Sequence, residues 1–222
     1  EVLMNQKYLS GVGNYIKAMA RLEQSMKGKF EGTFKGINDY GHIASKQHKD
    51  VPYQFKAKSI YKTMEDGADL ILWCDSVLYA KKSIEPIFEH IKEHGYIFFD
   101  NIGFSVGDYT SDKCLQYFGV DREKAFYMPM IMACCMGFNI HHPKTKEFLQ
   151  KYIAASEDGI TYPGAWSNLN TEVSSDMRVK GHRHDQSVAS ILINQLGMDI
   201  QKGNETFFMY EEHRKIMPMA DS

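Results

Sequence analysis

Apolar residues recur along this chain in two alternating patterns. Where they return every three or four positions, with polar residues between, they predict amphipathic helices. The helices are expected at 14–28, 52–67, 82–95, 111–119, 143–156 and 184–197. Short continuous apolar runs predict buried strands instead. The strands are expected at 30–39, 69–74, 96–101 and 128–140, with a last one within 198–203 or 206–210.

This alternation predicts an α/β fold with a largely parallel sheet that helices cover on both faces. With 222 residues, 43% of them hydrophobic, the chain is suited to a single domain over residues 1–222. One long stretch, about 157–183, lacks either pattern. Because it carries Tyr162 and Trp166, which disordered linkers tend to lack, we expect a functional loop there.

The balance of charge excludes one broad class of partner. Lys and Arg number 26 and Asp and Glu 28, so no basic excess predicts binding to nucleic acid. No apolar run approaches the roughly 20 residues that span a bilayer, and no membrane span is expected. The four cysteines form no spaced CxxC pairs, and Cys134 and Cys135 are expected to pack as small apolar side chains. A reduced, cytoplasmic protein is therefore expected. The chain starts at Glu1 rather than Met, which is typical of a fragment or a processed chain.

Three acids come at or just after the ends of predicted strands: Asp39, Asp75 and Asp100. In open α/β sheets, ligands bind beyond the carboxyl ends of the strands, so these acids are predicted to line one crevice. Asp75 is the strongest candidate, because the very apolar run that contains Trp73 leads straight to it. The alternative is that strands simply end in water, where acids are common.

The glycine-rich stretch "SGVGNYI" at 10–16 precedes a predicted helix. Its backbone N–H groups, with Ser10, Gly11 and Asn14, are suited to a phosphate or a nucleotide. It lacks the GxxxxGK[ST] pattern of a P-loop, and an ordinary loop before a helix is the alternative.

The stretch "GHRHDQS" at 181–187 holds the densest group of titratable residues. His182 and His184 alternate, so in an extended segment they point the same way. Neutral imidazole suits a transition metal, and cationic imidazole suits a phosphate. For Asp185 the alternative is the N-cap of the next helix. Lys56 lies on the helix before the Asp75 strand, where an anion-binding and an ordinary solvated lysine are both open.

Three stretches carry a resemblance to a known family: "YQFKAKSIYKTMEDGADLILWCDSVLY", "IFEHIKEHGYIFFDN" and "HRHDQSVASILINQLGM". Together they resemble nucleotide-sugar-dependent glycosyltransferases of the GT-A fold, especially the small transferases of bacterial and phage polysaccharide clusters. The resemblance runs from about residue 8 to 203. It implies a Rossmann-like domain that takes a nucleoside diphosphate sugar, UDP- or GDP-linked, and a glycan or glycoconjugate acceptor.

The family also implies an Asp-x-Asp signature that holds a divalent cation, Mn²⁺ or Mg²⁺, on the diphosphate. Asp75 matches its first position and Ser76 takes the variable one, but Val77 stands where the second acid belongs. The resemblance therefore leaves two options: a metal held by Asp75 and a late ligand such as His184, or a diphosphate neutralised by Lys or His without metal.

Further roles follow from the same resemblance. It implies nucleobase or ribose contacts from the segment Ser10–Asn14 and from Asp39. Glycosyl transfer by inversion needs a carboxylate base near the acceptor hydroxyl, and Asp100 is the candidate.

Two other functions fit the same residues. One is a metal-dependent hydrolase that uses Asp75, His182, His184 and Asp185. The other is a non-catalytic module that binds a nucleotide or carbohydrate, in which Val77 reflects lost catalysis.

Overall fold

The computed structural model describes residues 7–12, 16–37 and 43–210 of the chain. The strands are β1 (Lys7–Val12), β2 (Thr33–Ile37), β3 (Leu70–Cys74), β4 (Leu78–Ala80), β5 (Tyr96–Ser105), β6 (Pro129–Asn139) and β7 (Phe208–Tyr210). The helices are α1 (Ile16–Met26), α2 (Gln54–Glu65), α3 (Glu85–His94), α4 (Asp112–Tyr117), α5 (Arg122–Ala125), α6 (Pro143–Glu157) and α7 (His184–Gln195), with 3-10 turns η1 (Leu169–Thr171) and η2 (Asn204–Thr206). Each helix expected from the pattern is confirmed, and of the two places offered for the last strand, 206–210 contains β7. The elements β1, β4 and α5 were not predicted.

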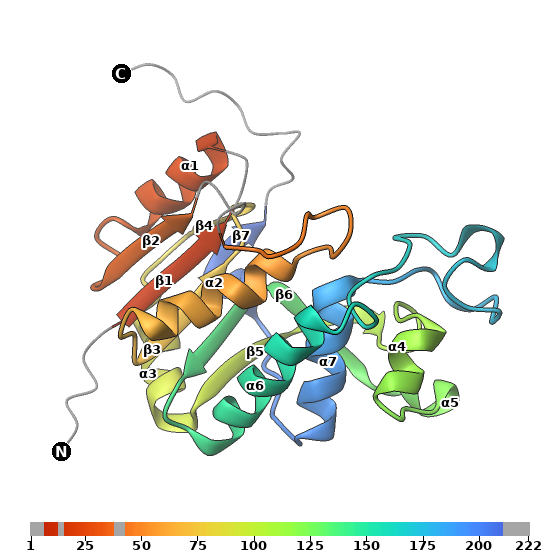
Figure 1. Ribbon diagram of the computed structural model, residues 1–222. Helices are drawn as coiled ribbons and strands as arrows, with labels where there is room; N and C mark the ends of the chain where they lie inside the picture. Colours follow the sequence, from red (N-terminus) through yellow and green to blue (C-terminus); the bar gives the residue numbers. More distant parts are fainter. Residues whose placement is uncertain (1–6, 13–15, 38–42, 211–222) are drawn as a thin grey trace.

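The central sheet has the strand order β2-β1-β3-β6-β5, and β4 pairs with β7 in a separate small sheet (Figure 1). Among the described strands, β1 pairs in parallel with β2 and β3, whereas β6 runs antiparallel to both β3 and β5. The mixed α/β class is confirmed, but a largely parallel sheet is not. An apolar run that is buried on both faces reads the same in either direction, so the pattern could not reveal that β6 is reversed.

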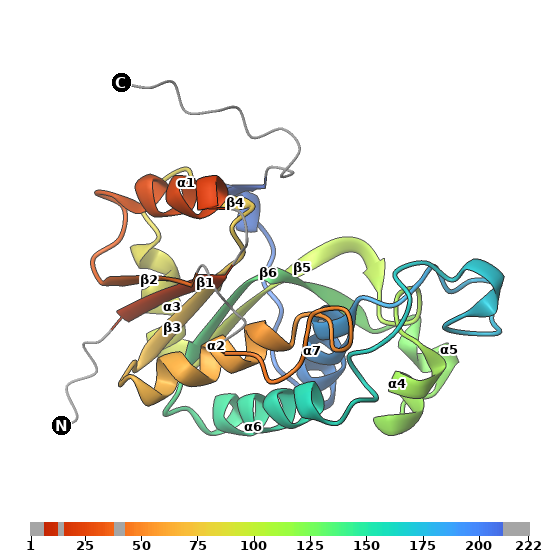
Figure 2. The same ribbon diagram turned by 45° about the horizontal axis from the view of Figure 1, so that its top comes forward.

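Helices cover both faces of this sheet, with α2, α6 and α7 on one side and α1 and α3 on the other (Figure 2). Strand β3 shows why. All five of its side chains are buried, and they alternate between two apolar clusters. Ile71 and Trp73 pack into the cluster under α2, α6 and α7, while Leu70, Leu72 and Cys74 pack into the other.

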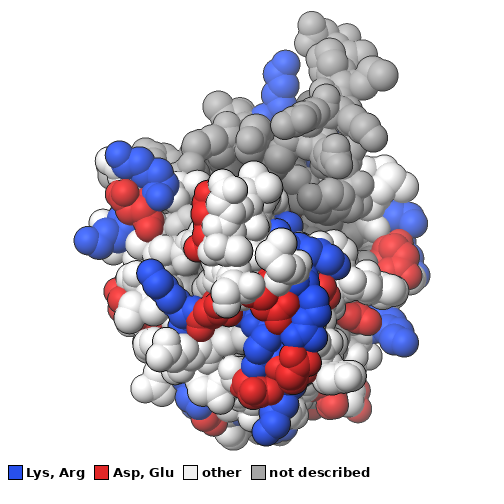
Figure 3. All heavy atoms as spheres, turned by 90° about the vertical axis from the view of Figure 1, so that its right-hand side faces the viewer, with Lys and Arg blue, Asp and Glu red and all other residues white. Residues whose placement is uncertain are grey.

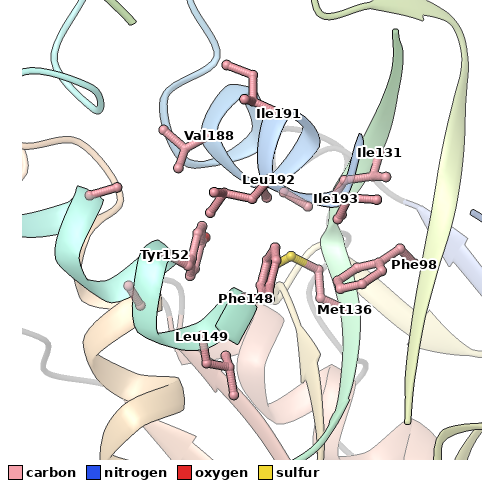
Figure 4. Close-up of a cluster of buried hydrophobic side chains, with 14 of the residues drawn as sticks. Phe98, Ile131, Met136, Phe148, Leu149, Tyr152, Val188, Ile191, Leu192 and Ile193 are labelled. Atoms are coloured by element: carbon pink, nitrogen blue, oxygen red, sulfur yellow. The ribbon is translucent and has the colours of Figure 1, made fainter. Parts of the chain in front are cut away.

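The larger cluster joins α6 and α7 to strands β5 and β6 (Figure 4). The ring of Phe148 is at its centre, 5.3 Å from that of Phe98 and 5.4 Å from that of Tyr152. Each large apolar side chain buried in this way stabilises the fold by about 1.5–3 kcal/mol. This packing fixes the start of α7 against the end of β3, where the candidate site lies.

Residues 158–183 join α6 to α7, with η1 as the only regular element between them, as an irregular stretch predicts. The stretch is tied to the connection between β5 and α4. The N–H of Lys180 donates to the carbonyl of Asp108 at 2.7 Å, and that of Asp112 donates to the carbonyl of Val173 at 2.9 Å. On this face of the molecule, acidic and basic side chains intermingle, and no large area of one sign stands out (Figure 3).

None of the helices in the described ranges combines the length and the apolar composition that crossing a membrane demands. Cys74, Cys114, Cys134 and Cys135 are all free thiols. Burial raises the pKa of Cys134 well above its ordinary value, with the charge of Asp75 adding to the effect, so the thiol stays protonated. Both Cys134 and Cys135 lie within β6, where Cys135 is buried as expected and Cys134 is half-buried.

Candidate active site

A cavity of about 330 Å³ lies at the end of β3. Its lining consists of Tyr53, Lys56, Asp75, Asn101, Met132, Ala133, Cys134, Trp166, Arg183, Asp185 and Gln186. These residues come from the start of α2, the end of β3, strands β5 and β6, the 158–183 stretch and the start of α7. Both the volume and the few convergent polar groups are typical of a small-molecule site.

Lys56 is buried in the wall of this cavity, with 2% of its side chain exposed. Its Nζ donates to the carbonyl of Ala133 at 3.0 Å and lies 2.7 Å from Asp185 Oδ2 and 3.4 Å from Asp75 Oδ1. Burial alone would lower the pKa of Lys56, but the charges of Asp185 and Asp75 outweigh it and hold the pKa well above its ordinary value. The ammonium stays charged between two carboxylates, and the solvated alternative for Lys56 is wrong.

Asp185 is buried in the first turn of α7. The N-cap is Arg183, which makes no side-chain cap hydrogen bond, so the capping interpretation of Asp185 is wrong. The carboxylate instead forms the ion pair with Lys56, although Oδ2 is not aligned with it as a hydrogen bond. Burial raises the pKa of Asp185 while the charge of Lys56 opposes the rise. Asp185 is therefore more basic than an exposed aspartate.

Asp75 directly follows β3, and 30% of its side chain is exposed. Its Oδ1 accepts a hydrogen bond from Trp73 Nε1 at 2.6 Å, and its backbone N–H donates to the carbonyl of Cys134 at 2.9 Å. The indole and Lys56 thus fix a carboxylate that is partly open to the cavity. The next residue, Ser76, is buried and is not among the lining residues.

The two histidines of "GHRHDQS" are neighbours, with ring centroids 5.3 Å apart. Both ring nitrogens of His182 are engaged: Nδ1 accepts from the N–H of Ser111 at 3.2 Å, and Nε2 donates to the carbonyl of Thr161 at 2.9 Å. His184 Nδ1 donates to the carbonyl of Tyr162 at 2.9 Å. Neither histidine is a lining residue, so His182 is structural and His184 contacts the site only through its neighbours.

Those neighbours form an aromatic wall. The ring of His184 lies 5.7 Å from that of Tyr53 and 5.8 Å from that of Trp166, and both of these line the cavity. Tyr53 and His184 both have positive φ angles, 62° and 48°, which non-glycine residues seldom adopt. Burial lowers the pKa of His184, so the ring is held neutral behind the wall.

The environment of His182 predicts a specific dependence of stability on pH. Burial lowers its pKa to about 3, with the neighbouring His184 adding to the effect. Protonation of Nδ1 would also replace the hydrogen bond that it accepts from the N–H of Ser111 by a contact between two protons. The unfolded chain takes up a proton near pH 6.5 and the folded chain does not, so stability is lost as the pH falls from about 6.5 toward 3. Between pH 7 and pH 5 we expect His182 alone to remove about 2 kcal/mol from the free energy of unfolding.

Urea unfolding at several pH values measures this loss in three proteins: the parent, His182→Gln and His94→Gln, which changes an exposed histidine. The free energy of unfolding should depend less steeply on pH in His182→Gln than in the other two. An equal dependence in all three would contradict the conclusion that His182 is buried in its neutral form.

Asp100 lies in β5, but it is not among the residues that line the cavity. The next residue, Asn101, lines it instead. The expectation that Asp100 shares one crevice with Asp75 is therefore wrong. Successive side chains of a strand point to opposite faces, and the pairing of β5 with β6 is irregular around Asp100, so the exact position that reaches a cavity is not readable from strand ends. The role of Asp100 as a base remains an untested prediction.

The predicted nucleotide-binding segment is only partly described. Ser10 and Gly11 lie in β1 rather than in a loop, paired with Lys35 and Gly36 of β2. Asn14 and Asp39 lie outside the described residues, so the contacts expected of them remain predictions.

Several lining residues were not predicted as site residues: Tyr53, Asn101, Trp166, Arg183 and Gln186. Arg183 and Gln186 stand inside "GHRHDQS", where the chemistry was predicted for the histidines and for Asp185. The signal for Trp166 was its presence in a long irregular stretch, which predicted a functional loop without naming a role.

The predicted ligand pair, Asp75 and His184, does not fit a resident divalent cation. Asp75 lines the cavity and His184 does not, so the two side chains do not share it. Asp75 Oδ1 also faces the ammonium of Lys56, which would repel a second cation. Within the described ranges, no three His, Cys, Asp or Glu side chains gather as metal ligands would. A cation that arrives with a donor remains an untested prediction.

Comparison with known proteins returns glycosyltransferases. No family model matches the chain, and no curated protein matches it either. Among solved structures, one match is a glycosyltransferase involved in glycosylation of the major capsid of PBCV-1, with 13% identity over 69% of this chain and 68% of that one, and a TM-score of 0.44. Another is the galactosyltransferase LgtC with donor and acceptor sugar analogues, with 12% identity over 84% of this chain and 70% of that one, and a TM-score of 0.42.

A third match is mouse xyloside xylosyltransferase 1, with 10% identity over 88% of this chain and 84% of that one, and a TM-score of 0.46. These matches agree with the resemblance drawn from the sequence. With identities this low and TM-scores below 0.5, they carry no argument about the donor, the acceptor or the reaction of this chain.

Proposed function

We propose that the chain is a glycosyltransferase that moves a sugar from a nucleoside diphosphate sugar to an acceptor hydroxyl. The observation that carries this proposal is the cavity at the end of β3, where Asp75 and Asp185 flank the buried ammonium of Lys56. Ligands of open α/β sheets bind at this place, beyond the carboxyl end of a strand.

The chemistry of the lining suits glycosyl transfer. The sugar gains positive charge in the transition state, and the acceptor hydroxyl must lose a proton. Asp75 is the more exposed of the two carboxylates, and its orientation is fixed by Trp73 and Lys56. It is suited to stabilise the positive charge or to accept the proton, and both roles need its negative charge. Asn101 and Gln186 supply polar groups for sugar hydroxyls.

The aromatic wall has a complementary role. Trp166 has 54% of its surface exposed and borders the cavity from the 158–183 stretch. Planar rings cover apolar faces of sugars and limit water access to the site. Exclusion of water favours transfer over hydrolysis of the donor.

The hydrolase alternative loses its proposed ligands in this structure. Both nitrogens of His182 are engaged in the core, Asp185 is paired with Lys56, and His184 does not line the cavity. The non-catalytic alternative predicts binding of the same ligands without turnover, so it is an outcome of the test.

Thermal unfolding with a panel of nucleoside diphosphates, with and without Mn²⁺, tests the proposal. A ligand at about 100 times its Kd should stabilise the chain by about 2.7 kcal/mol, which raises the Tm by roughly 5–10 °C in a chain of this size. We expect UDP or GDP to produce such a shift, and the matching nucleotide sugar to release its diphosphate faster when an acceptor is added. Absence of a shift with every nucleoside diphosphate would contradict the proposal. Binding without release would favour the module, and stabilisation by metal alone would favour the hydrolase.

A further inference from the structure

The lining of the cavity has two positively charged side chains, Lys56 and Arg183. Lys56 is committed, because its ammonium is buried between Asp75 and Asp185 and donates to a backbone carbonyl. Arg183 makes no ion pair with any carboxylate among the described residues, which sets it apart from the nearby Arg178 that pairs with Glu123 and Asp176.

Arg183 is also held in a fixed position. Its guanidinium lies 3.9 Å from the ring centroid of Trp166 and 4.5 Å from that of Tyr109. Nη1 donates to the carbonyl of Trp166 at 2.5 Å. The backbone of Gly181 also lies against Trp166, because a Cβ at that position would be 1.9 Å from the same carbonyl oxygen. The side chain is thus ordered before any ligand binds, which reduces the entropy lost on binding.

The charges of the lining show what Arg183 does for an anion. Asp75 and Asp185 carry two negative charges and Lys56 one positive charge, so these three groups together repel an anion. Arg183 brings the formal charge of the lining to zero. A guanidinium has five N–H donors in a planar fork that matches phosphate oxygens, and Arg183 gives one of them to the carbonyl of Trp166.

We infer that Arg183 binds the diphosphate of the donor, in the role that the sequence assigned to a metal site or to Lys56 and His184. This inference rests on the proposed function and deepens it, since it names the residue that recognises the anionic part of the donor. It implies that the wild-type protein binds UDP or GDP, and inorganic pyrophosphate more weakly, through a contact with Arg183.

Calorimetric titration of Arg183→Gln, with Arg178→Gln as the matched control on the same stretch, tests the inference. The probes are UDP, GDP, uridine, guanosine and inorganic pyrophosphate, at low and high NaCl. Loss of a charge-assisted contact should weaken binding of the preferred nucleoside diphosphate and of pyrophosphate on the order of 10- to 100-fold. The nucleoside should bind as before, because it has no phosphate. Arg178→Gln should bind every probe as the wild type does.

Arg183→Lys separates recognition from a structural role. It keeps the charge but loses the planar fork, so its affinity for the diphosphate should fall between the wild type and Arg183→Gln. The affinity of the wild type should also fall more steeply with NaCl than that of Arg183→Gln. Equal affinity of the wild type and Arg183→Gln for the diphosphate would overturn the inference and leave the proposed function standing. If the wild type binds no nucleoside diphosphate, the proposed function itself fails.

Discussion

Replacing Lys56 by methionine is expected to lower the free energy of unfolding by about 3–5 kcal/mol. The substitution keeps most of the apolar stem but removes the ammonium, which leaves the buried carboxylate of Asp185 without its counter-ion and Asp75 with the indole of Trp73. A buried charge without a partner costs far more than the net contribution of the pair that it formed. Urea unfolding monitored by fluorescence or circular dichroism measures the loss.

The control for this experiment is Lys58→Met on the same helix. Lys58 pairs with Glu157 near the surface, and exposed pairs contribute at most about 1 kcal/mol. In Lys56→Met, burial raises the pKa of Asp185 without the opposing charge of Lys56, so the folded state takes up a proton that the unfolded state does not hold. The destabilisation should therefore shrink as the pH falls toward 4. Equal stability of the two methionine variants would show that the charge of Lys56 is not buried between carboxylates.

Replacing Asp75 by asparagine is expected to lower the turnover of the nucleotide sugar by about 100-fold or more, while the fold is kept. The amide oxygen of asparagine can still accept from Trp73 Nε1, and Lys56 retains its closer partner, Asp185. The variant therefore loses the negative charge in the cavity and little else. Release of UDP or GDP, measured with and without an acceptor, gives the rate.

Asp50→Asn is the matched control, because Asp50 is exposed and is not among the lining residues. Its turnover should equal that of the parent chain. If Asp75→Asn turns over the donor at the parental rate, Asp75 has no part in the reaction, and the proposed site must be reconsidered.

Local patterns predicted most of the elements, because the period of apolar residues depends only on neighbours in sequence. Helix α6 begins at Pro143, and helix α3 ends at Gly95, which has a φ of 91°. Both boundaries follow from the local preferences of those residues. Strand β1 was missed because glycine and serine are poor strand formers, and its place between β2 and β3 comes from the sheet. The reversed direction of β6 was missed because direction is set by connections and not by composition.

The candidate site was predicted in part for the same reason. Asp75 follows a buried strand, and that position alone placed it at a cavity. The burial of Lys56 depends on Asp185, which is far away in sequence, so its amphipathic helix could not reveal it. Arg183 was overlooked because it matters for a contact that it does not make: it has no carboxylate partner among the described residues. Only the folded arrangement shows this.

The two carboxylates around Lys56 also constrain the order in which the chain acquires its structure during synthesis. Lys56 and Asp75 leave the ribosome before Asp185, which belongs to α7. Until that helix is made and docked, α2 cannot settle on the sheet without desolvating an ammonium that lacks its closest counter-ion. The N-terminal half of this chain is therefore expected to stay loosely packed on the ribosome and to consolidate only when α7 arrives.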